Sequence, residues 1–456
     1  MKPDIHAYLR PDMHAHLIGI GGVSMSPLAD VLHKSGMIIT GSDMSESATV
    51  QHLRSLGIMV YQGHHADHIS GADCIIRTAA VHDDNPEIAA AHQAGIPVFE
   101  RAEAWGAIMR QYENALCVSG THGKTTTTSM CTEIFMAAHR DPTVMIGGIL
   151  PSLGTGHRVG QGDTIILESC EYYNSFHAFS PTIAIILNVD ADHLDFFKDL
   201  EDIQNSFRHF ASLVPEQGWV IANADDLNTM NAIFGLNRPI ITFGIQNGTV
   251  TAQNITWNNG FATFDLIEDG VCLGSISLQV PGIHNVYNAL AAACAARKLN
   301  IPLTAIQEGL HNFTGAGRRF EYKGRYHGAA VYDDYAHHPS ELHALFTAVK
   351  NLGYQRIICA FQPHTYTRTK ELFDEFLSVL HLPDVVLLAE IYAAREQNTL
   401  GISSLDLVKQ LPNAQFCATL SDVTDKLKEL AQPGDLILTV GAGDIYRAGE
   451  QLLSIS

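Results

Sequence analysis

The sequence has few basic residues. It holds 28 Lys and Arg against 48 Asp and Glu among 456 residues, which gives a formal net charge of −20 at pH 7. Nucleic acids and acidic membranes bind proteins through a surplus of Lys and Arg, so this shortage argues against both kinds of partner. An anionic small molecule would have to be held by a few locally placed cations. Each Lys or Arg beside a glycine turn or a polar cluster is therefore informative.

The sequence also lacks long apolar runs and a cysteine framework. No tract approaches the roughly 18 apolar residues of a membrane span. The first residues, MKPDIHAYLRPDMHAH, have proline, aspartate and three histidines where a signal peptide needs an apolar stretch. The eight cysteines are scattered without framework spacing. These features predict a cytoplasmic protein with no membrane-spanning segment.

What the sequence does contain is typical of a folded α/β protein, with 46% hydrophobic residues, 17% charged residues and 37 glycines. Short apolar runs alternate with amphipathic stretches, as in βα elements around parallel sheets. The length and the pattern predict three domains, at residues 1–113, 114–320 and 321–456. We expect the first and last to be Rossmann-like. The middle one should be a P-loop ATPase-type α/β domain with a small antiparallel side sheet between Thr249 and Val280, where polar and apolar residues alternate.

A first glycine turn follows the predicted strand HAHLIGIGG. The turn contains Gly19, Gly21 and Gly22. A helix is predicted from about Ser26 to Ser35, and Asp43 lies about 20 residues on, where a Rossmann domain places its ribose acceptor. This pattern makes a dinucleotide-dependent oxidoreductase one hypothesis. The third glycine position is Ser24, however, so the fingerprint is incomplete, and a tight turn without a ligand is the alternative.

A second glycine turn lies in CVSGTHGKTTTTSM, residues 117–130. Gly120, Gly123, Lys124 and Thr125 lie between a predicted strand and a predicted helix, so the backbone amides and the ammonium can hold the β- and γ-phosphates of a nucleotide. The Thr125 hydroxyl can bind Mg²⁺. The turn is shorter than the standard phosphate loop, because Val118 stands where that loop has its first glycine.

Acidic residues follow two apolar strands of the same predicted domain. They are Glu168 and Glu171 in IILESCE, and Asn188, Asp190, Asp192 and His193 in ILNVDADH. Mg²⁺ prefers oxygen ligands, so carboxylates at neighbouring strand ends are candidates for its ligands. Each of these acids by itself is more often a helix cap or a salt-bridge partner. Their common position in the domain that holds Lys124 predicts a metal site.

Two further clusters lie towards the C-terminus. Arg318 and Arg319 are interpreted as cations that neutralise charge on a transferring phosphoryl group. The last cluster consists of Asp333, Asp334, His337 and His338 after one strand, and His364 and Arg368 after the next. Arg368 can bind a carboxylate through both arms of its guanidinium. A zinc site among these histidines is an alternative that lacks the usual ligand spacing. His64, His65 and His68 are interpreted as surface or turn residues.

Taken in order along the chain, these motifs resemble the Mur ligase family. GTHGKTTT is similar to the ATP loop of that family, which uses the shortened G-T-x-G-K-[ST] turn. The other matching segments are GIGGVSMSPLA with GSD, GIHNVYNALAA, GAGRRFE, DDYAHHPSEL, FQPHTYTRT and GAGDIY. The resemblance covers essentially the whole chain. It implies an ATP-dependent ligase of peptidoglycan precursor synthesis that joins L-alanine to the lactyl carboxylate of UDP-N-acetylmuramate through an acyl phosphate. The three domains would bind the UDP-sugar, ATP and the amino acid in that order.

The resemblance also implies roles for individual residues. The UDP-sugar contacts would be Gly19, Gly21, Gly22, Val23, Ser24, Ser42 and Asp43. The ATP contacts would be Gly120, Thr121, His122, Gly123, Lys124, Thr125, Thr126, Asn285, Asn288 and Arg319. The metal ligands, for Mg²⁺ or alternatively Mn²⁺, would be Thr125, Glu171 and His193. The catalytic residues would be Lys124, Arg319, Asp334 and His337. The amino-acid contacts would be His338 and Arg368.

The sequence departs from the family pattern at two points. Thr365 stands where some members carry an additional arginine. DLEDIQNSFRHF, after the Asp-His pair, has no lysine, so the carbamylated lysine of related ligases is not expected. Three alternatives remain: a recycling ligase that adds an intact tripeptide to the same sugar, the oxidoreductase, and a catalytically silent regulator, which the intact acid and lysine set disfavours. A monomer or a homodimer is expected.

Overall fold

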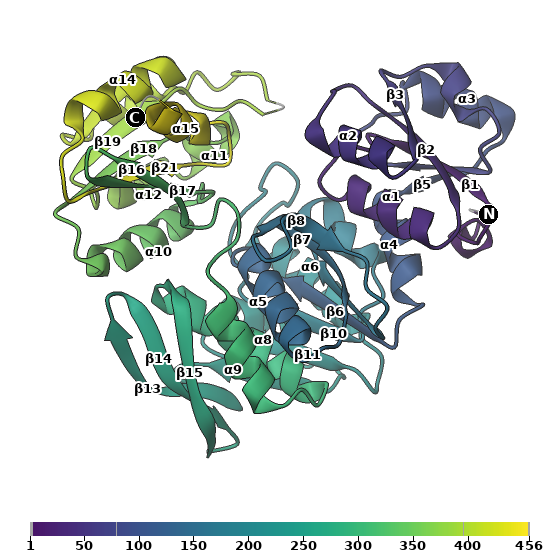
Figure 1. The fold of residues 1–456 in the computed structure, drawn as a ribbon, viewed down its shortest axis with the longest axis horizontal. Helices are drawn as coiled ribbons and strands as arrows, with labels where there is room; N and C mark the ends of the chain where they lie inside the picture. The colour runs from purple at the N-terminus through teal and green to yellow at the C-terminus, as the bar shows by residue number, and fades with distance from the viewer. Residues whose placement is uncertain (1–2, 79, 395, 455–456) are drawn as a thin grey trace. The chain divides into compact units, whose positions relative to one another are not determined.

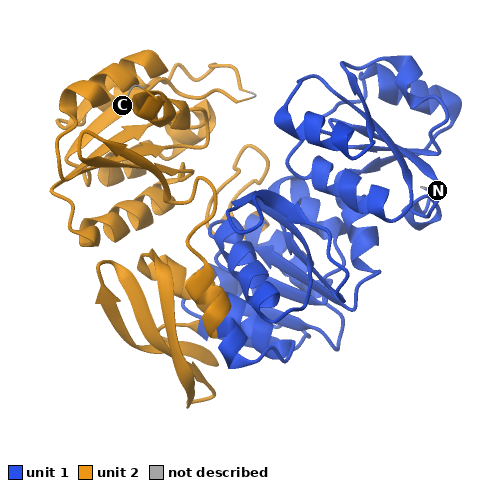
Figure 2. Cartoon of the chain, viewed as in Figure 1, with its two compact units in different colours: residues 1–189, 203–243, 291–306 blue, residues 190–202, 244–290, 307–456 orange. Residues whose placement is uncertain are grey.

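The computed structural model describes residues 3–78, 80–394 and 396–454. The chain divides into two compact units, which Figure 2 shows in different colours. Unit 1 comprises residues 1–189, 203–243 and 291–306, and unit 2 comprises residues 190–202, 244–290 and 307–456.

Unit 1 begins with a parallel sheet of strand order β3-β2-β1-β4-β5. Its strands are β1 (His14–Ile18), β2 (Ile38–Asp43), β3 (Met59–Gln62), β4 (Cys74–Arg77) and β5 (Val98–Glu100). Its helices are α1 (Met25–Lys34), α2 (Ala48–Ser55), α3 (Pro86–Ala94) and α4 (Arg101–Met109), with the short 3₁₀ helices η1 (Ile5–Ala7) and η2 (Ala66–Ile69). The predicted strand HAHLIGIGG contains β1, whereas β3 and β5 are too short to be distinguished by pattern. The predicted Rossmann-like character of the first domain is confirmed.

The second sheet has the strand order β12-β11-β10-β6-β9-β7-β8 within unit 1, and only the β7–β8 pair of these is antiparallel. Its strands are β6 (Asn114–Ser119), β7 (Thr143–Leu150), β8 (Thr155–Arg158), β9 (Thr164–Glu168), β10 (Ile183–Ile186), β11 (Trp219–Asn223) and β12 (Ile240–Gly244). The helices along this stretch are α5 (Lys124–Ala137), η3 (Tyr172–Ala178), α6 (Leu200–Ser212) and α7 (Leu227–Ile233). Helix α8 (Ile283–Lys298) is divided between the two units, with residues 283–290 in unit 2 and 291–298 in unit 1. Helix α5 packs on β6, β7 and β9 (Figure 1).

Unit 2 contains the predicted antiparallel side sheet. Its strands are β13 (Val250–Asn258), β14 (Phe261–Glu268) and β15 (Val271–Pro281), and successive strands pair antiparallel. The alternation of buried and more exposed residues along β14 is that of a strand with one covered face. The prediction of a small antiparallel sheet is therefore confirmed.

The last sheet of unit 2 has the order β16-β17-β21-β18-β19-β20, parallel except for the β16–β17 pair. Its strands are β16 (Glu321–Tyr326), β17 (Ala329–Asp334), β18 (Arg356–Phe361), β19 (Val385–Ala389), β20 (Ala414–Cys417) and β21 (Asp435–Val440). The helices that follow α8 are α9 (Leu303–Asn312), α10 (Pro339–Val349), η4 (Lys350–Leu352), α11 (Tyr366–Glu371), α12 (Phe373–Leu380), α13 (Ser404–Val408), α14 (Leu420–Leu430) and α15 (Tyr446–Ser454).

This sheet is apolar on both faces. One face packs against Phe346 of α10 and Phe376 of α12, and the other packs against Leu427 of α14 and Leu452 of α15. Parallel strands covered on both faces leave only their ends open to ligands, and polar residues follow the carboxyl ends of β17 and β18. The predicted α/β fold class is confirmed, and the limits 1–113, 114–320 and 321–456 stay a prediction. Within the described residues, we find no helix with the length and apolar character that crossing a membrane requires.

Candidate functional site

The phosphate loop of unit 1 joins β6 to α5. Gly120 and Gly123 have φ angles of 140° and 83°, in the left-handed region that favours glycine. A Cβ on Gly120 would lie 2.9 Å from the Leu187 Cβ. The Asn188 side chain fixes the loop, because its oxygen accepts from the His122 amide at 2.8 Å and its nitrogen donates to the His122 carbonyl at 3.1 Å. Asn188, considered from sequence as part of a metal site, thus positions the loop.

The ammonium of Lys124 is buried at the first position of α5. Its Nζ donates to the carbonyls of Gly120 at 2.6 Å and Thr121 at 3.0 Å, and to Glu171 at 2.9 Å. Burial opposes the charged form of Lys124, but the nearby Glu171 carboxylate outweighs it and raises the pKa of Lys124 above its ordinary value. The ammonium is therefore charged at pH 7. The ammonium is held against the loop, where it could contact a bound phosphate.

Side-chain oxygen atoms that could bind a metal ion lie near Lys124 within unit 1. The Thr125 hydroxyl donates to Glu168 at 3.1 Å, and the Gly147 amide donates to the other Glu168 oxygen at 2.6 Å. A Cβ on Gly147 would lie 2.4 Å from Glu168 Oε1, so this close approach requires glycine. Glu171 is 2% exposed and faces Lys124. Two carboxylates and a hydroxyl are hard oxygen donors, a set that fits Mg²⁺.

Asp334 follows β17 in unit 2 and is buried. Its carboxylate accepts from the Phe320 amide at 2.7 Å and from the Ala336 amide at 2.6 Å. Burial raises the pKa of Asp334 to about 6, and the positive charge of Arg319 acts in the opposite direction. Asp334 thus anchors the backbone that leads into the segment Tyr335–His338.

The two adjacent arginines of unit 2 have different partners. Arg318 donates to Asp333 at 2.9 Å and to the Gly441 carbonyl at 2.6 Å, so it ties the loop to the sheet. The Arg319 guanidinium lies 5.1 Å from the Tyr335 ring centroid, and no acceptor for it is found among the residues that the structure describes. Of the two arginines, only Arg319 therefore remains a candidate for neutralising phosphoryl charge.

Arg368 of α11 pairs with Asp192 in unit 2. The guanidinium donates to Asp192 Oδ1 through two nitrogens, at 2.7 and 3.2 Å, and each side chain is 10% exposed. Burial opposes the charge of Asp192, but Arg368 more than offsets it and holds the pKa of Asp192 well below its usual range. Thr365 has a φ of 67° and caps α11, its side chain accepting from the Arg368 amide. A carboxylate ligand of Arg368 would have to share the guanidinium with Asp192.

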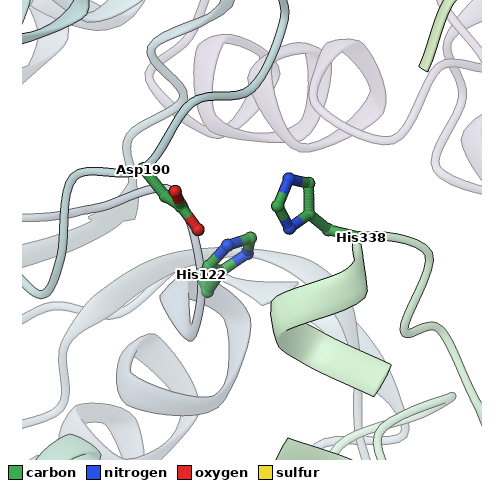
Figure 3. A group of neighbouring side chains, drawn as sticks. All are labelled: His122, Asp190 and His338. Atoms are coloured by element: carbon green, nitrogen blue, oxygen red, sulfur yellow. The ribbon is translucent and has the colours of Figure 1, made fainter. Parts of the chain in front are cut away.

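The remaining predicted residues of unit 2 lie in short hydrogen-bonded segments. His338 caps α10, with its Nδ1 2.9 Å from the Ser340 hydroxyl and its Nε2 3.3 Å from the Ala191 carbonyl. The Ser340 hydroxyl donates to Asp190 at 2.7 Å; Figure 3 shows Asp190 and His338. His193 has a φ of 55°, and its amide donates to Asp192.

Asn285 and Asn288 lie one turn apart on α8 and are buried. Asn285 donates to the Pro281 carbonyl at 2.7 Å, and Asn288 donates to the Asn285 side-chain oxygen at 3.0 Å. Residues three apart share a helix face, so both amides are presented on one side of α8.

The first glycine turn of unit 1 is shaped by Asp43. Its carboxylate accepts from the Gly21 amide at 2.9 Å and from the Ser45 amide at 2.9 Å. A Cβ on Gly21 would lie 2.9 Å from Asp43 Oδ2, so a larger residue there would displace the Asp43 carboxylate. Asp43 therefore closes the turn, and its predicted contact with a UDP-sugar stays a prediction.

The interpretation of the histidines 64 and 68 as surface or turn residues is wrong. Both rings face the buried carboxylate of Glu87, with His64 Nδ1 at 3.2 Å and His68 Nδ1 at 2.8 Å. Ser42 donates to the same carboxylate at 2.6 Å. His65 is exposed, as expected. The sequence could not show this cluster, because nothing in NPEIAAA indicates that the glutamate on α3 points inward.

Models of known protein families match this chain along most of its length. The family model for the Mur ligase middle domain matches residues 118–296, that for the Mur ligase family, catalytic domain, matches 14–113, and that for the Mur ligase, glutamate ligase domain, matches 318–443. A UDP-N-acetylmuramate–L-alanine ligase from Clostridium novyi (strain NT) is 46% identical over 442 residues, which are 96% of each chain.

The chain belongs to the Mur ligase family.

Solved structures of Mur ligases agree with this assignment. The crystal structure of UDP-N-acetylmuramate-alanine ligase MurC from Thermotoga maritima is 30% identical, has a TM-score of 0.82 and covers 97% of this chain and 99% of its own. The UDP-N-acetylmuramate:L-alanyl-gamma-D-glutamyl-meso-diaminopimelate ligase from Neisseria meningitides is 27% identical with a TM-score of 0.62, over 67% of this chain and 99% of its own.

Within this Mur ligase, the predicted site residues divide between the two units. Lys124, Thr125 and Glu171 lie together in unit 1, whereas His193 belongs to unit 2. The set of three metal ligands therefore stays a prediction. Reasoning from sequence overlooked Gly147, which carries no side chain that would mark a site.

The stability of this Mur ligase should depend on pH through His337. Burial lowers the pKa of His337 from its ordinary value of 6.5 to about 3, with Glu341, Arg368, Asp192 and His364 facing the ring. The unfolded chain therefore binds the proton first as pH falls. The free energy of unfolding should decrease from pH 6.5 towards 3, by up to about 1.4 kcal/mol per pH unit for this one group.

Urea unfolding at a series of pH values checks this expectation. The His337→Gln variant lacks the ring, so its stability should fall less steeply below pH 6.5 than that of the unmodified protein. Equal slopes for the two proteins would contradict the assignment of a buried, neutral His337.

Proposed function

We propose that this Mur ligase joins L-alanine to the lactyl carboxylate of UDP-N-acetylmuramate, with ATP as the phosphoryl donor. The observation that carries the proposal is the 46% identity, over 96% of both chains, to a protein with that printed name. The arrangement of Lys124, Thr125 and Glu171 at a phosphate loop supports an ATP-dependent reaction. It does not fit the oxidoreductase alternative, which gives Lys124 no role.

The reaction has two steps. A carboxylate oxygen of the sugar attacks the γ-phosphorus of ATP, the bond to the bridging oxygen breaks, and ADP leaves an acyl phosphate behind. The amine nitrogen of L-alanine then attacks the acyl carbon, the bond to the phosphate oxygen breaks, and inorganic phosphate leaves as the nitrogen loses a proton. A free carboxylate is a poor acyl donor, so the protein mainly positions the reactants and neutralises charge.

Two cations of the chain are suited to neutralise that charge. Lys124 is charged at pH 7 and lies at the phosphate loop, and Arg319 has no hydrogen-bond acceptor among the described residues. Thr125 and Glu171, together with His193, would hold Mg²⁺, with Mn²⁺ as the alternative. The metal would shield the phosphate oxygens from the incoming carboxylate.

The C-terminal residues would bind L-alanine and move its proton. Arg368 would orient the alanine carboxylate, with His338 beside the α10 N-terminus. His337 is neutral at pH 7, because burial lowers its pKa to about 3, so the ring has a lone pair that can receive the amine proton. Asp334, whose carboxylate holds the Ala336 amide, would keep the segment before His337 in place.

The remaining roles follow the family resemblance. The turn at Gly19 to Ser24, with Ser42 and Asp43, would bind the UDP-sugar, and Asn285 and Asn288 would contact the nucleotide. The cytoplasmic location and the monomeric or homodimeric state stay predictions.

Phosphate release by the purified protein tests the proposal. Release should require ATP, UDP-N-acetylmuramate and L-alanine together, and omission of any one should reduce it to background. Replacement of L-alanine by the tripeptide distinguishes the recycling ligase. Equal or better turnover with the tripeptide would contradict the alanine assignment, and turnover without UDP-N-acetylmuramate would contradict the whole proposal.

A further inference from the structure

Unit 1 contains a cavity of about 250 Å³ between its two sheets. Gly22 and Ser24 of the first glycine turn line it, with Thr78 after β4 and Arg101 at the start of α4. Glu168, which accepts from Thr125 of the phosphate loop, also lines it. The cavity is therefore bounded both by the turn assigned to the UDP-sugar and by a residue that contacts the ATP loop.

Arg101 is a half-buried cation with no partner. Among the residues that the structure describes, none accepts a hydrogen bond from its guanidinium or forms an ion pair with it. The adjacent acid, Glu100, accepts from Arg77 at 2.8 Å and is thus already paired. Burial lowers the pKa of Arg101, against weaker opposing contributions from Cys170 and Glu100. Proteins rarely bury a charge without compensation, so an unpaired guanidinium in a cavity points to an anionic ligand.

The glycine turn supplies further donors on the same cavity. The amides of Val23 and Ser24 donate to no residue in the described part of the chain. Trp105 of α4 donates through Nε1 to the Ser24 carbonyl and to the Ser24 hydroxyl, each at 3.3 Å. The helix that carries Arg101 is thereby connected to the turn, so the cation and the free amides are held by one packed arrangement.

We propose that Arg101 binds the diphosphate of the UDP-linked sugar in this cavity. The inference rests on the proposed function and adds a binding residue to it. A guanidinium matches phosphate oxygens through two parallel hydrogen bonds. The lactyl carboxylate of UDP-N-acetylmuramate would suit the same side chain, but the backbone amides at the turn favour the diphosphate.

Calorimetric titration with UDP tests the proposal, because UDP carries the diphosphate and lacks the lactyl carboxylate. Arg101→Gln should weaken UDP binding about 10- to 100-fold, and Arg101→Lys should lose less because it keeps the charge. The matched control is Arg110→Gln. Arg110 follows the same helix and donates to Ser180 at 3.0 Å, and it does not line the cavity. The Arg110→Gln variant should bind UDP with the same affinity as the unmodified protein.

Two measurements distinguish a ligand-binding role of Arg101 from a purely structural one. The thermal midpoint of unliganded Arg101→Gln should equal or exceed that of the unmodified protein, because an unpaired charge is removed, and uridine, which has no phosphate, should bind both equally. Unchanged UDP binding by Arg101→Gln would overturn the inference while leaving the ligase function intact. A loss confined to UDP-N-acetylmuramate would overturn it in favour of the carboxylate. Absence of UDP binding by the unmodified protein would contradict the proposed function itself.

Discussion

Lys124→Ala should lower phosphate release from ATP by at least about 10³-fold, the scale seen when a cation that stabilises phosphoryl transfer is removed. The ammonium lies at the mouth of the loop before α5 and is charged because Glu171 outweighs its burial. No other lysine occurs between residues 35 and 197, so none in this stretch can replace it. A phosphate-release assay with all three substrates measures the effect.

The same substitution should also destabilise the fold, which the sequence by itself does not predict. Lys124 and Glu171 form an ion pair with side chains 14% and 3% exposed. Removal of one partner from a buried pair costs about 3–5 kcal/mol. The double variant Lys124→Ala with Glu171→Gln leaves no unpaired charge, so its thermal midpoint should recover while its activity stays absent. Near-normal turnover by either variant would refute the role of Lys124.

Arg319→Ala should reduce the rate of phosphate release by about 10³-fold with little change in thermal stability. Its guanidinium contacts the Tyr335 ring, and no acceptor for it is found among the described residues, so removal breaks no hydrogen bond that holds the fold. The expected loss is in turnover, because the charge that Arg319 would neutralise develops only during phosphoryl transfer.

Its neighbour Arg318 provides the matched control. Arg318 pairs with Asp333, which is 1% exposed, so Arg318→Ala leaves a buried carboxylate without its partner. The variant should lose about 3–5 kcal/mol of stability, which thermal and urea unfolding would measure. If Arg318→Ala lost only activity and Arg319→Ala only stability, the roles assigned to the two arginines would have to be exchanged.

The fold and the glycine loop between β6 and α5 could be predicted because their signals are local. β6, the glycines of the loop and α5 follow one another within residues 114–137, and parallel-sheet strands are recognisable as apolar runs. The side sheet at β13–β15 was likewise predicted from alternation along each strand. By contrast, the strands β3 and β5 are too short to show a pattern, and the inward-facing Glu87 lies on a helix whose sequence does not indicate its buried face.

The sequence determined the order of the motifs, the position of the glycine loop before α5 and the chemical types of side chain available to the predicted site. The tertiary structure decided which of those side chains are already paired. Arg368 meets Asp192 across 176 positions of the chain, and Arg318 meets the carbonyl of Gly441 across 123. Charge and burial depend on neighbours in space, and two adjacent arginines of identical chemistry therefore differ in the acceptors that folding brings within their reach.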